Sequence, residues 1–277
     1  MGKYIIKADG KIEPYDEEKI SSSFIKAGAS TEIAAAAAKT INKKVKDNMS
    51  TDEIYHRALS HLKVLEPGVA LKYSLKRAVM DMGPEGFVFE KYIAKILMEY
   101  GFVAEVGQIL NGHCVNHEVD IIAEKENQIC MIECKYHNSR GTKSDIKTAL
   151  YIHSRFLDIE KAYMEKDINN NTHLEAWLVT NTKCTSDAIK YAGCVGLKIL
   201  AWHYPEVENL EYFIETKKLY PISILSTITE RQRDILFNSN IILAKELGSC
   251  KMDSLAKLIS VRQSRASKIL NEAAIII

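Results

Sequence analysis

The chain has 277 residues, which is more than a single domain usually contains, so two or three domains are the first expectation. With 47% hydrophobic and 26% charged residues, it can bury a real core. Lys and Arg total 37 against 36 Asp and Glu, a net charge of +1, which excludes a global positive field as the basis of nucleic-acid binding and leaves only local patches.

The N-terminal region predicts two short strands in residues 3–15, joined by a turn at Asp9-Gly10. Four helical stretches follow, and two of them open with Ser-Thr and an acid, as helix N-termini often do. These stretches are residues 16–29, 30–48, 50–65 and 68–83. Gly and Pro in residues 83–86 then indicate a boundary, so the first domain is expected to span residues 1–84.

The next region alternates helices with apolar strands, which predicts an α/β core with a mixed sheet over residues 85–204. A helix is expected first, then three strands, a long helix, a polar loop, a strand, a helix and a last strand. These segments are residues 85–102, 103–110, 117–125, 128–136, 142–166, 167–173, 175–181, 185–196 and 197–203. Residues 205–219 are interpreted as a linker.

The last region, residues 220–277, is helical throughout. Residues 229–247 and 252–273 each predict two short helices around a tight turn. The fold class expected for the chain is therefore α/β multidomain, with a helical first domain that carries a short hairpin, a central α/β core and an all-α C-terminal domain.

Two apolar runs of the central region carry acids on segments otherwise suited to burial. Asp120 heads one run, and Glu133 and Lys135 end the other. If the runs pair as a hairpin, the two carboxylates converge at one edge of the sheet, and Glu133 and Lys135 point to the same face. Buried carboxylates are costly unless they share a cation, which predicts a divalent metal site beside an amine. The simpler interpretation is a surface ion pair at a strand end.

Glu90 on the preceding helix, Asp120, and Glu133-Cys134-Lys135 together resemble the PD-(D/E)xK nucleases, and specifically their Mrr-like restriction endonuclease branch, over residues 85–204. Val119-Asp120 stands where the family has Pro-Asp. The resemblance implies Mg²⁺ bound by Asp120, Glu133 and the backbone carbonyl of Cys134, with Lys135 orienting or deprotonating the attacking water and Glu90 completing the outer part of the site. The neighbouring residues His113, His117 and His137 and the Cys134 thiol are not assigned catalytic roles.

The first domain resembles the ATP-cone, a nucleotide-binding module that regulates ribonucleotide reductases. Lys7, Asp16 and Lys19 match motif residues, while Ala8 replaces a basic residue. Arg77 lies in a segment like the closing part of the cone. The resemblance implies that ATP or dATP binds here, since converging cations suit a triphosphate. The alternative is a degenerate cone that only packs or forms a homodimer.

The C-terminal region resembles a helix-hairpin-helix pair, which holds DNA phosphates without sequence preference. Arg262, Arg265 and Lys268 supply positive charge. The glycines expected in the hairpins are absent, so a plain helical packing module is the alternative.

We therefore predict a Mg²⁺-dependent endodeoxyribonuclease whose partners are DNA and an adenine nucleotide. The alternative is a catalytically inert DNA-binding regulator that senses nucleotide through the cone. A ribonucleotide reductase regulator is disfavoured, because the six cysteines include no CxxC pair and no zinc-site spacing. No run approaches the ~18 apolar residues of a membrane span, and no signal peptide is evident, so a cytoplasmic protein without membrane contact is expected.

Overall fold

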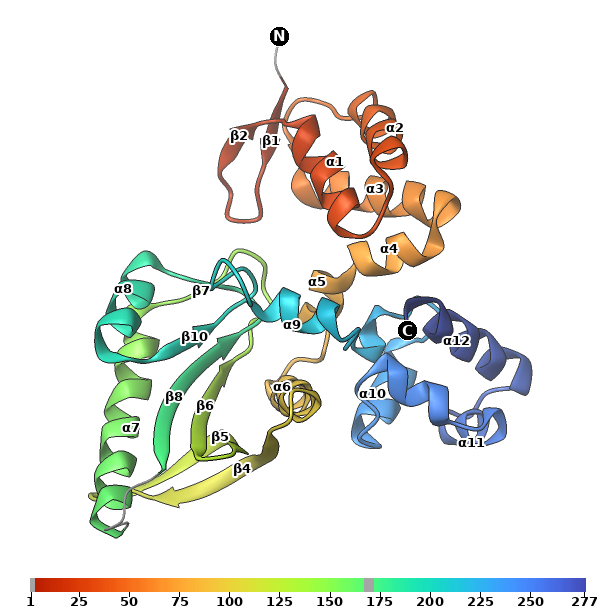
Figure 1. Cartoon of the computed structure of the whole chain (residues 1–277). Helices are drawn as coiled ribbons and strands as arrows, with labels where there is room; N and C mark the ends of the chain where they lie inside the picture. Colours follow the sequence, from red (N-terminus) through yellow and green to blue (C-terminus); the bar gives the residue numbers. More distant parts are fainter. Residues whose placement is uncertain (1–2, 167–171) are drawn as a thin grey trace. The chain divides into compact units, whose positions relative to one another are not determined.

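The computed structural model describes residues 3–166 and 172–277 (Figure 1). The polar loop expected at residues 167–173 falls outside the described residues for 167–171. The chain divides into two compact units, one combining Met1–Val79 with Ile222–Ile277 and the other formed by Met80–Pro221. The two terminal regions, expected to be separate domains, thus share one unit, and the central region is a continuous segment inserted between them.

A small sheet and five helices make up the N-terminal part of the first unit. Strands β1 (Tyr4–Ile6) and β2 (Ile12–Pro14) pair antiparallel around the predicted turn, and β3 (Met49–Ser50) pairs parallel to β1. The helices are α1 (Glu17–Lys26), α2 (Thr31–Asn42), α3 (Thr51–Leu65), α4 (Pro67–Tyr73) and α5 (Leu75–Met80). Side-chain oxygens of Ser30 and Ser50 cap α2 and α3, as the Ser-Thr starts predicted. The helix expected over residues 68–83 is instead divided at Ser74.

The C-terminal part of the first unit is a cluster of short helices that ends in a longer one. Its elements are η1 (Ile222–Ile224), α10 (Glu230–Asn238), η2 (Ala244–Ser249), α11 (Met252–Leu258) and α12 (Gln263–Ile276). Thr229 and Gln232 form a capping box at the start of α10. This part packs against the N-terminal part through α12 and α4, and Ser223 Oγ donates a hydrogen bond to the Ala78 carbonyl at 2.6 Å.

The second unit is built on a mixed five-stranded sheet with the order β10-β8-β6-β5-β4. Its strands are β4 (Val103–Asn111), β5 (Asn116–Lys125), β6 (Gln128–Lys135), β8 (His173–Thr180) and β10 (Lys198–Leu200), with β7 (Lys143–Ser144) and β9 (Lys183–Cys184) paired apart. β4, β5 and β6 run antiparallel, whereas β6, β8 and β10 run parallel. The mixed sheet that the alternation of helices and apolar strands predicted is therefore present, and the chain as a whole is a multidomain α/β protein.

Helices cover both faces of this sheet. The helices of this unit are α6 (Phe87–Glu99), α7 (Ile146–Lys166), α8 (Ser186–Val195) and α9 (Leu210–Thr216). Figure 1 shows α6 on one side of the strands and α7 on the other, and the contacts agree, since α6 packs on β4 and β5 while α7 packs on β8 and α8. The central strand β6 accordingly buries every residue from Cys130 to Cys134.

The segment expected to be a linker, residues 205–219, is part of the second unit. Leu210 and Ile214 of α9 and Leu219 are fully buried. Tyr100 Oη donates to the Phe213 carbonyl at 3.0 Å, and Tyr92 Oη donates to the Leu219 carbonyl at 2.8 Å. The apolar residues of this segment are therefore core residues, which is why it does not behave as a linker.

Candidate functional site

The site begins where β5 and β6 separate. The two strands pair from Lys125 and Gln128 as far as Ile121 and Ile132. The next residues in this register are Asp120 and Glu133, and beyond them β5 pairs only with β4 while β6 continues beside β8. A carboxylate oxygen of Asp120 accepts a hydrogen bond from the Cys134 amide at 2.7 Å. The side chain of Asp120 thus stands beside Glu133 at the fork between the strands.

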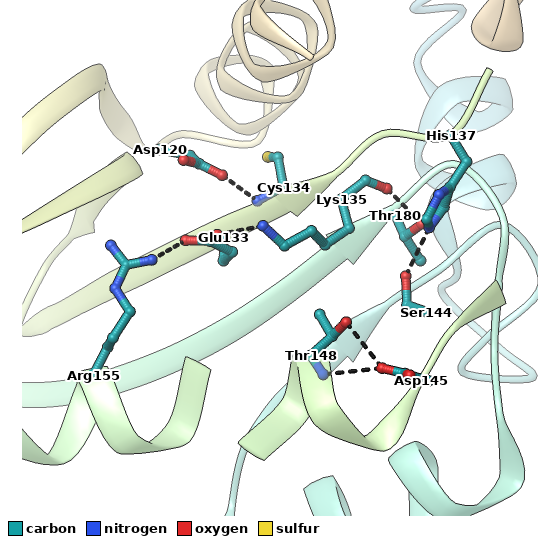
Figure 2. A network of polar contacts seen from close by, with 10 residues as sticks. All are labelled: Asp120, Glu133, Cys134, Lys135, His137, Ser144, Asp145, Thr148, Arg155 and Thr180. Atoms are coloured by element: carbon teal, nitrogen blue, oxygen red, sulfur yellow. Dashed lines mark hydrogen bonds and ion pairs between the residues drawn. The ribbon is translucent and has the colours of Figure 1, made fainter. Parts of the chain in front are cut away.

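Glu133 is held by two cations. Its side chain is 9% exposed, and its two oxygens accept from Lys135 Nζ at 2.5 Å and from an Arg155 guanidinium nitrogen at 2.6 Å. Figure 2 shows Arg155 rising from α7 toward Glu133, with Lys135 on the opposite side. Arg155 is not among the site residues predicted from the sequence. The available signal was an arginine on the same stripe of a helix as the buried Ile152 and Ile159.

Burial and neighbouring acids raise the pKa of Glu90 and of Asp120. Burial, followed by the negative charges of Asp120 and Glu133, raises the pKa of Glu90 to about 7. Burial and Glu133 likewise raise the pKa of Asp120, against the opposing effect of the Cys134 amide and of Lys135. Glu90, Asp120 and Glu133 therefore form one electrostatic cluster, although they come from a helix and two strands.

We expect the free energy of unfolding of the second unit to fall as pH rises from about 4.5 to about 7 in metal-free buffer. The folded-state pKa of Glu90 lies above its ordinary value. Its contribution to the free energy of unfolding is therefore complete below pH 4.5 and is lost as the carboxyl ionises near pH 7. Both tryptophans of the chain, Trp177 and Trp202, lie in this unit, so urea unfolding followed by their fluorescence reports on it. Glu90→Gln should remove this part of the pH dependence, and an unchanged profile in that variant would contradict the assignment.

The chemistry of the cluster suits a hard cation. Carboxylate oxygens and the Cys134 carbonyl are the donors that Mg²⁺ prefers. Among the residues that the structure describes, no group of three or more His, Cys, Asp and Glu side chains is arranged to hold a metal ion. Burial is the main cause of the raised pKa of Glu90 and of Asp120, and the charge of neighbouring acids adds to it, a contribution that a bound cation would offset. Burial and the same acids raise the pKa of the Cys134 thiol, which keeps it neutral.

Buried polar residues fix the chain just beyond Lys135. Thr180 Oγ1 donates to the Lys135 carbonyl at 2.7 Å. Asn181, fully buried, accepts from the His137 amide at 2.9 Å and donates to the His137 carbonyl at 2.8 Å. His137 also contacts Ser144 Oγ at 3.1 Å (Figure 2). These contacts, which have no local sequence signal, hold the end of β6 in place for Lys135.

The other two histidines next to the acids have partners of their own. His117 Nε2 lies 2.7 Å from Asp158, and His113 Nδ1 lies 3.1 Å from Glu165. Asp158 also accepts from the Cys114 and Val115 amides, so it pins the β4–β5 hairpin to α7. This arrangement agrees with their interpretation as structural residues rather than catalytic ones.

The cations expected to bind nucleotide lie in different local surroundings. Lys7 Nζ pairs with Glu13 at 3.5 Å within the hairpin. Asp16 caps α1 through the Glu18 amide, and Lys19 Nζ lies 3.9 Å from Asp16. The Arg77 guanidinium instead lies 2.6 Å from Asp52 and 3.1 Å from the centre of the Tyr55 ring. An open hollow of roughly 350 Å³ beside α1 is lined by Asp16 and Lys19 but by neither Lys7 nor Arg77.

The three basic residues expected to bind DNA also differ. Arg262 and Lys268 are exposed at α12. Arg265 is only partly exposed, and its guanidinium donates to the Thr227 carbonyl. It therefore ties α12 to the start of the C-terminal part instead of presenting its charge to solvent.

Comparisons with known proteins show which families and proteins this chain is similar to. The ATP cone domain matches residues 3–81, and the family described as AF1548-like, C-terminal, matches residues 220–277. An uncharacterized protein of Archaeoglobus fulgidus is 36% identical over 181 residues, which are 65% of this chain and 97% of that protein. The chain belongs to the AF1548-like family. The crystal structure of AF1548, described as a protein of unknown function, matches with 35% identity and a TM-score of 0.57 over 69% of this chain and 97% of its own.

These matches confirm part of what the sequence predicted for this AF1548-like protein. The N-terminal ATP-cone is present, and it suggests an adenine nucleotide as ligand. The C-terminal region, for which the sequence predicts a helix-hairpin-helix pair, matches the AF1548-like C-terminal family. Among the described residues, no helix combines the length and apolar character needed to cross a membrane.

Proposed function

We propose that the second unit is a Mg²⁺-dependent endodeoxyribonuclease that hydrolyses DNA phosphodiester bonds. The observation that carries this proposal is the fork between β5 and β6, where Asp120 and Glu133 are neighbours in register and Lys135 lies 2.5 Å from Glu133. The order of these residues resembles the PD-(D/E)xK nucleases, and the mixed sheet with helices on both faces is compatible with a restriction endonuclease-like core.

The residues of the site would divide the work as follows. Asp120, Glu133 and the Cys134 carbonyl would hold Mg²⁺, which, when bound, polarises a phosphate oxygen and offsets the charge of the transition state. Lys135, whose ammonium group lies 2.5 Å from Glu133, would orient the attacking water. Glu90, whose pKa is raised to about 7, can exchange a proton with water near neutral pH at the outer side of the cluster.

ATP or dATP at the cone is proposed to regulate this activity. The motif residues Lys7, Asp16 and Lys19 at the hairpin and α1 support nucleotide binding at that end of the cone. Arg77 would have to leave Asp52 to reach a phosphate there, so its role is less direct. The cone therefore binds a triphosphate chiefly through the lysines.

Lys19→Ala is expected to weaken ATP binding roughly tenfold or more, because a charge-assisted hydrogen bond contributes about 1.5–3 kcal/mol. Titration calorimetry of the full chain with ATP and dATP measures this, and affinity should fall as salt rises. Lys63→Ala, at an exposed position of α3, is the matched control and should bind like the unchanged chain. Equal affinity of the two variants would place the nucleotide elsewhere on the cone.

One observation favours a second function, a catalytically inert DNA-binding regulator that senses nucleotide. Both oxygens of Glu133 are already bonded to cations, Lys135 and Arg155, an arrangement that can stabilise the site without a metal. Incubation of supercoiled plasmid with the chain, Mg²⁺ or Mn²⁺ and ATP or dATP separates the two functions. A nuclease converts the supercoiled plasmid to open-circular or linear DNA. A regulator leaves the plasmid intact, and its affinity for DNA changes when nucleotide is added.

A further inference from the structure

Helices α11 and α12 are joined by a tight turn of a particular kind. The turn consists of residues 259–262, and Ser260 adopts a left-handed conformation with φ 54°. The Val261 amide donates to the Ala256 carbonyl at 2.9 Å, which closes the end of α11. Two helices joined by three or four residues, often with a glycine where this chain has the left-handed Ser260, are the hallmark of a helix-turn-helix.

The packing of the two helices leaves one face of α12 in solvent. Leu255 and Ile259 of the α11 region and Ala266, Ile269 and Ala273 of α12 are buried, and α12 packs on α11, η2 and α4. The exposed positions of α12 recur at helical spacing along its opposite face. The polar ones are Gln263, Ser264, Lys268 and Asn271, and Ala274 and Ile275 are exposed at the end of the helix.

We propose that α12 is a recognition helix that enters the major groove of duplex DNA and reads base edges, so that this chain binds DNA with a sequence preference. The inference rests on the proposed function in taking duplex DNA as the substrate. Gln and Asn pair with adenine, and Lys with guanine, in that groove. The first helix of such a motif crosses the DNA backbone, and α11 carries exposed Lys257 for that contact.

The charges around the motif fit this partner. Lys251, Lys257, Arg262 and Lys268 are exposed on α11, the turn and α12. The exposed acid of α11, Asp253, accepts from Gln263 Nε2 at 2.7 Å, which orients the Gln263 side chain. A helix-hairpin-helix, which the sequence predicts, would contact only phosphates and bind DNA without sequence preference. A recognition helix also contacts base edges, so sequence preference distinguishes the two.

Selection of binding sites from randomised duplex DNA tests the proposal. The full chain is used in EDTA, so that DNA is not cut, because removing residues 222–277 would take Ile275 away from Gly68 and Ser223 from Ala78. We expect a motif to be enriched, and the enriched duplex to bind at least roughly 100-fold more tightly than a scrambled one.

Point variants locate the contacts. Lys268→Ala and Asn271→Ala should each lower affinity for the enriched duplex about tenfold and relax selection at one or two base positions. Lys257→Ala should lower the affinity for the enriched and the scrambled duplex by similar factors. Lys63→Ala should leave both affinities unchanged. Tight binding without an enriched motif would overturn base reading and leave DNA as the partner. Absence of binding to any duplex would overturn both this inference and the nuclease proposal, and would leave α12 as a protein-binding face.

Discussion

The rate of plasmid nicking in Mg²⁺ is expected to fall by roughly 10³-fold or more in Asp120→Asn, because a ligand charge worth several kcal/mol in the transition state is lost. The amide oxygen of the new side chain can still accept from the Cys134 amide, a bond of 2.7 Å in the unchanged chain. The substitution therefore removes charge and keeps the fork between β5 and β6 intact. The measurement is the initial rate of conversion of supercoiled to open-circular DNA.

The matched control is Glu124→Gln, which removes a carboxylate from an exposed position near the other end of β5. It should nick at the rate of the unchanged chain. Unfolding followed by tryptophan fluorescence should show that both variants are folded. If Asp120→Asn and the unchanged chain nick at the same rate, the activity belongs to another site or to a contaminant.

Arg155→Met is expected to lower the free energy of unfolding of the second unit by about 3 kcal/mol in EDTA. Glu133 is 9% exposed, and loss of the guanidinium nitrogen at 2.6 Å leaves one of its buried oxygens without this charged donor. Urea unfolding followed by Trp177 and Trp202 measures the loss. Mg²⁺ or Ca²⁺ should recover part of it, since a cation would replace the missing charge next to Glu133.

Two further variants make this result specific. Lys147→Met changes an exposed cation on the same helix and should alter stability by no more than about 0.5 kcal/mol. Glu133→Gln added to Arg155→Met should restore part of the loss, because the uncompensated charge is then gone. An Arg155→Met protein as stable as the unchanged chain would mean that Lys135 alone compensates Glu133.

Local signals explain most of what could be predicted from the sequence. The Asp9-Gly10 turn, the serine caps and the alternation of apolar strands with helices all depend on residues close together in the chain, and each appears in the structure. The adjacency of Asp120 and Glu133 was also predictable, since one hairpin register determines it. The two strands that carry them are interior strands of the sheet, because β4 pairs with β5 on one side and β8 pairs with β6 on the other.

What could not be predicted depends on contacts between distant residues. Arg155 reaches Glu133 from 22 positions further along the chain, and Asn181 reaches His137 from 44 positions away. Arg265 is turned toward Thr227 rather than solvent, although its neighbours Arg262 and Lys268 are exposed. Composition and periodicity contain no information about such pairs. Predictions from clusters of basic residues in the sequence therefore counted more cations as available to ligands than the structure exposes.

The discontinuous first unit has a consequence for the order in which the chain becomes folded during synthesis. Met80–Pro221 is continuous and can form its core as soon as it has left the ribosome, whereas the unit that contains Met1–Val79 is completed only when Ile222–Ile277 has been made. Until then, Gly68 and Ala78 lack their partners Ile275 and Ser223. A product of interrupted translation that ends before Ile222 would therefore carry the proposed nuclease site, unaccompanied by a completed nucleotide-binding unit.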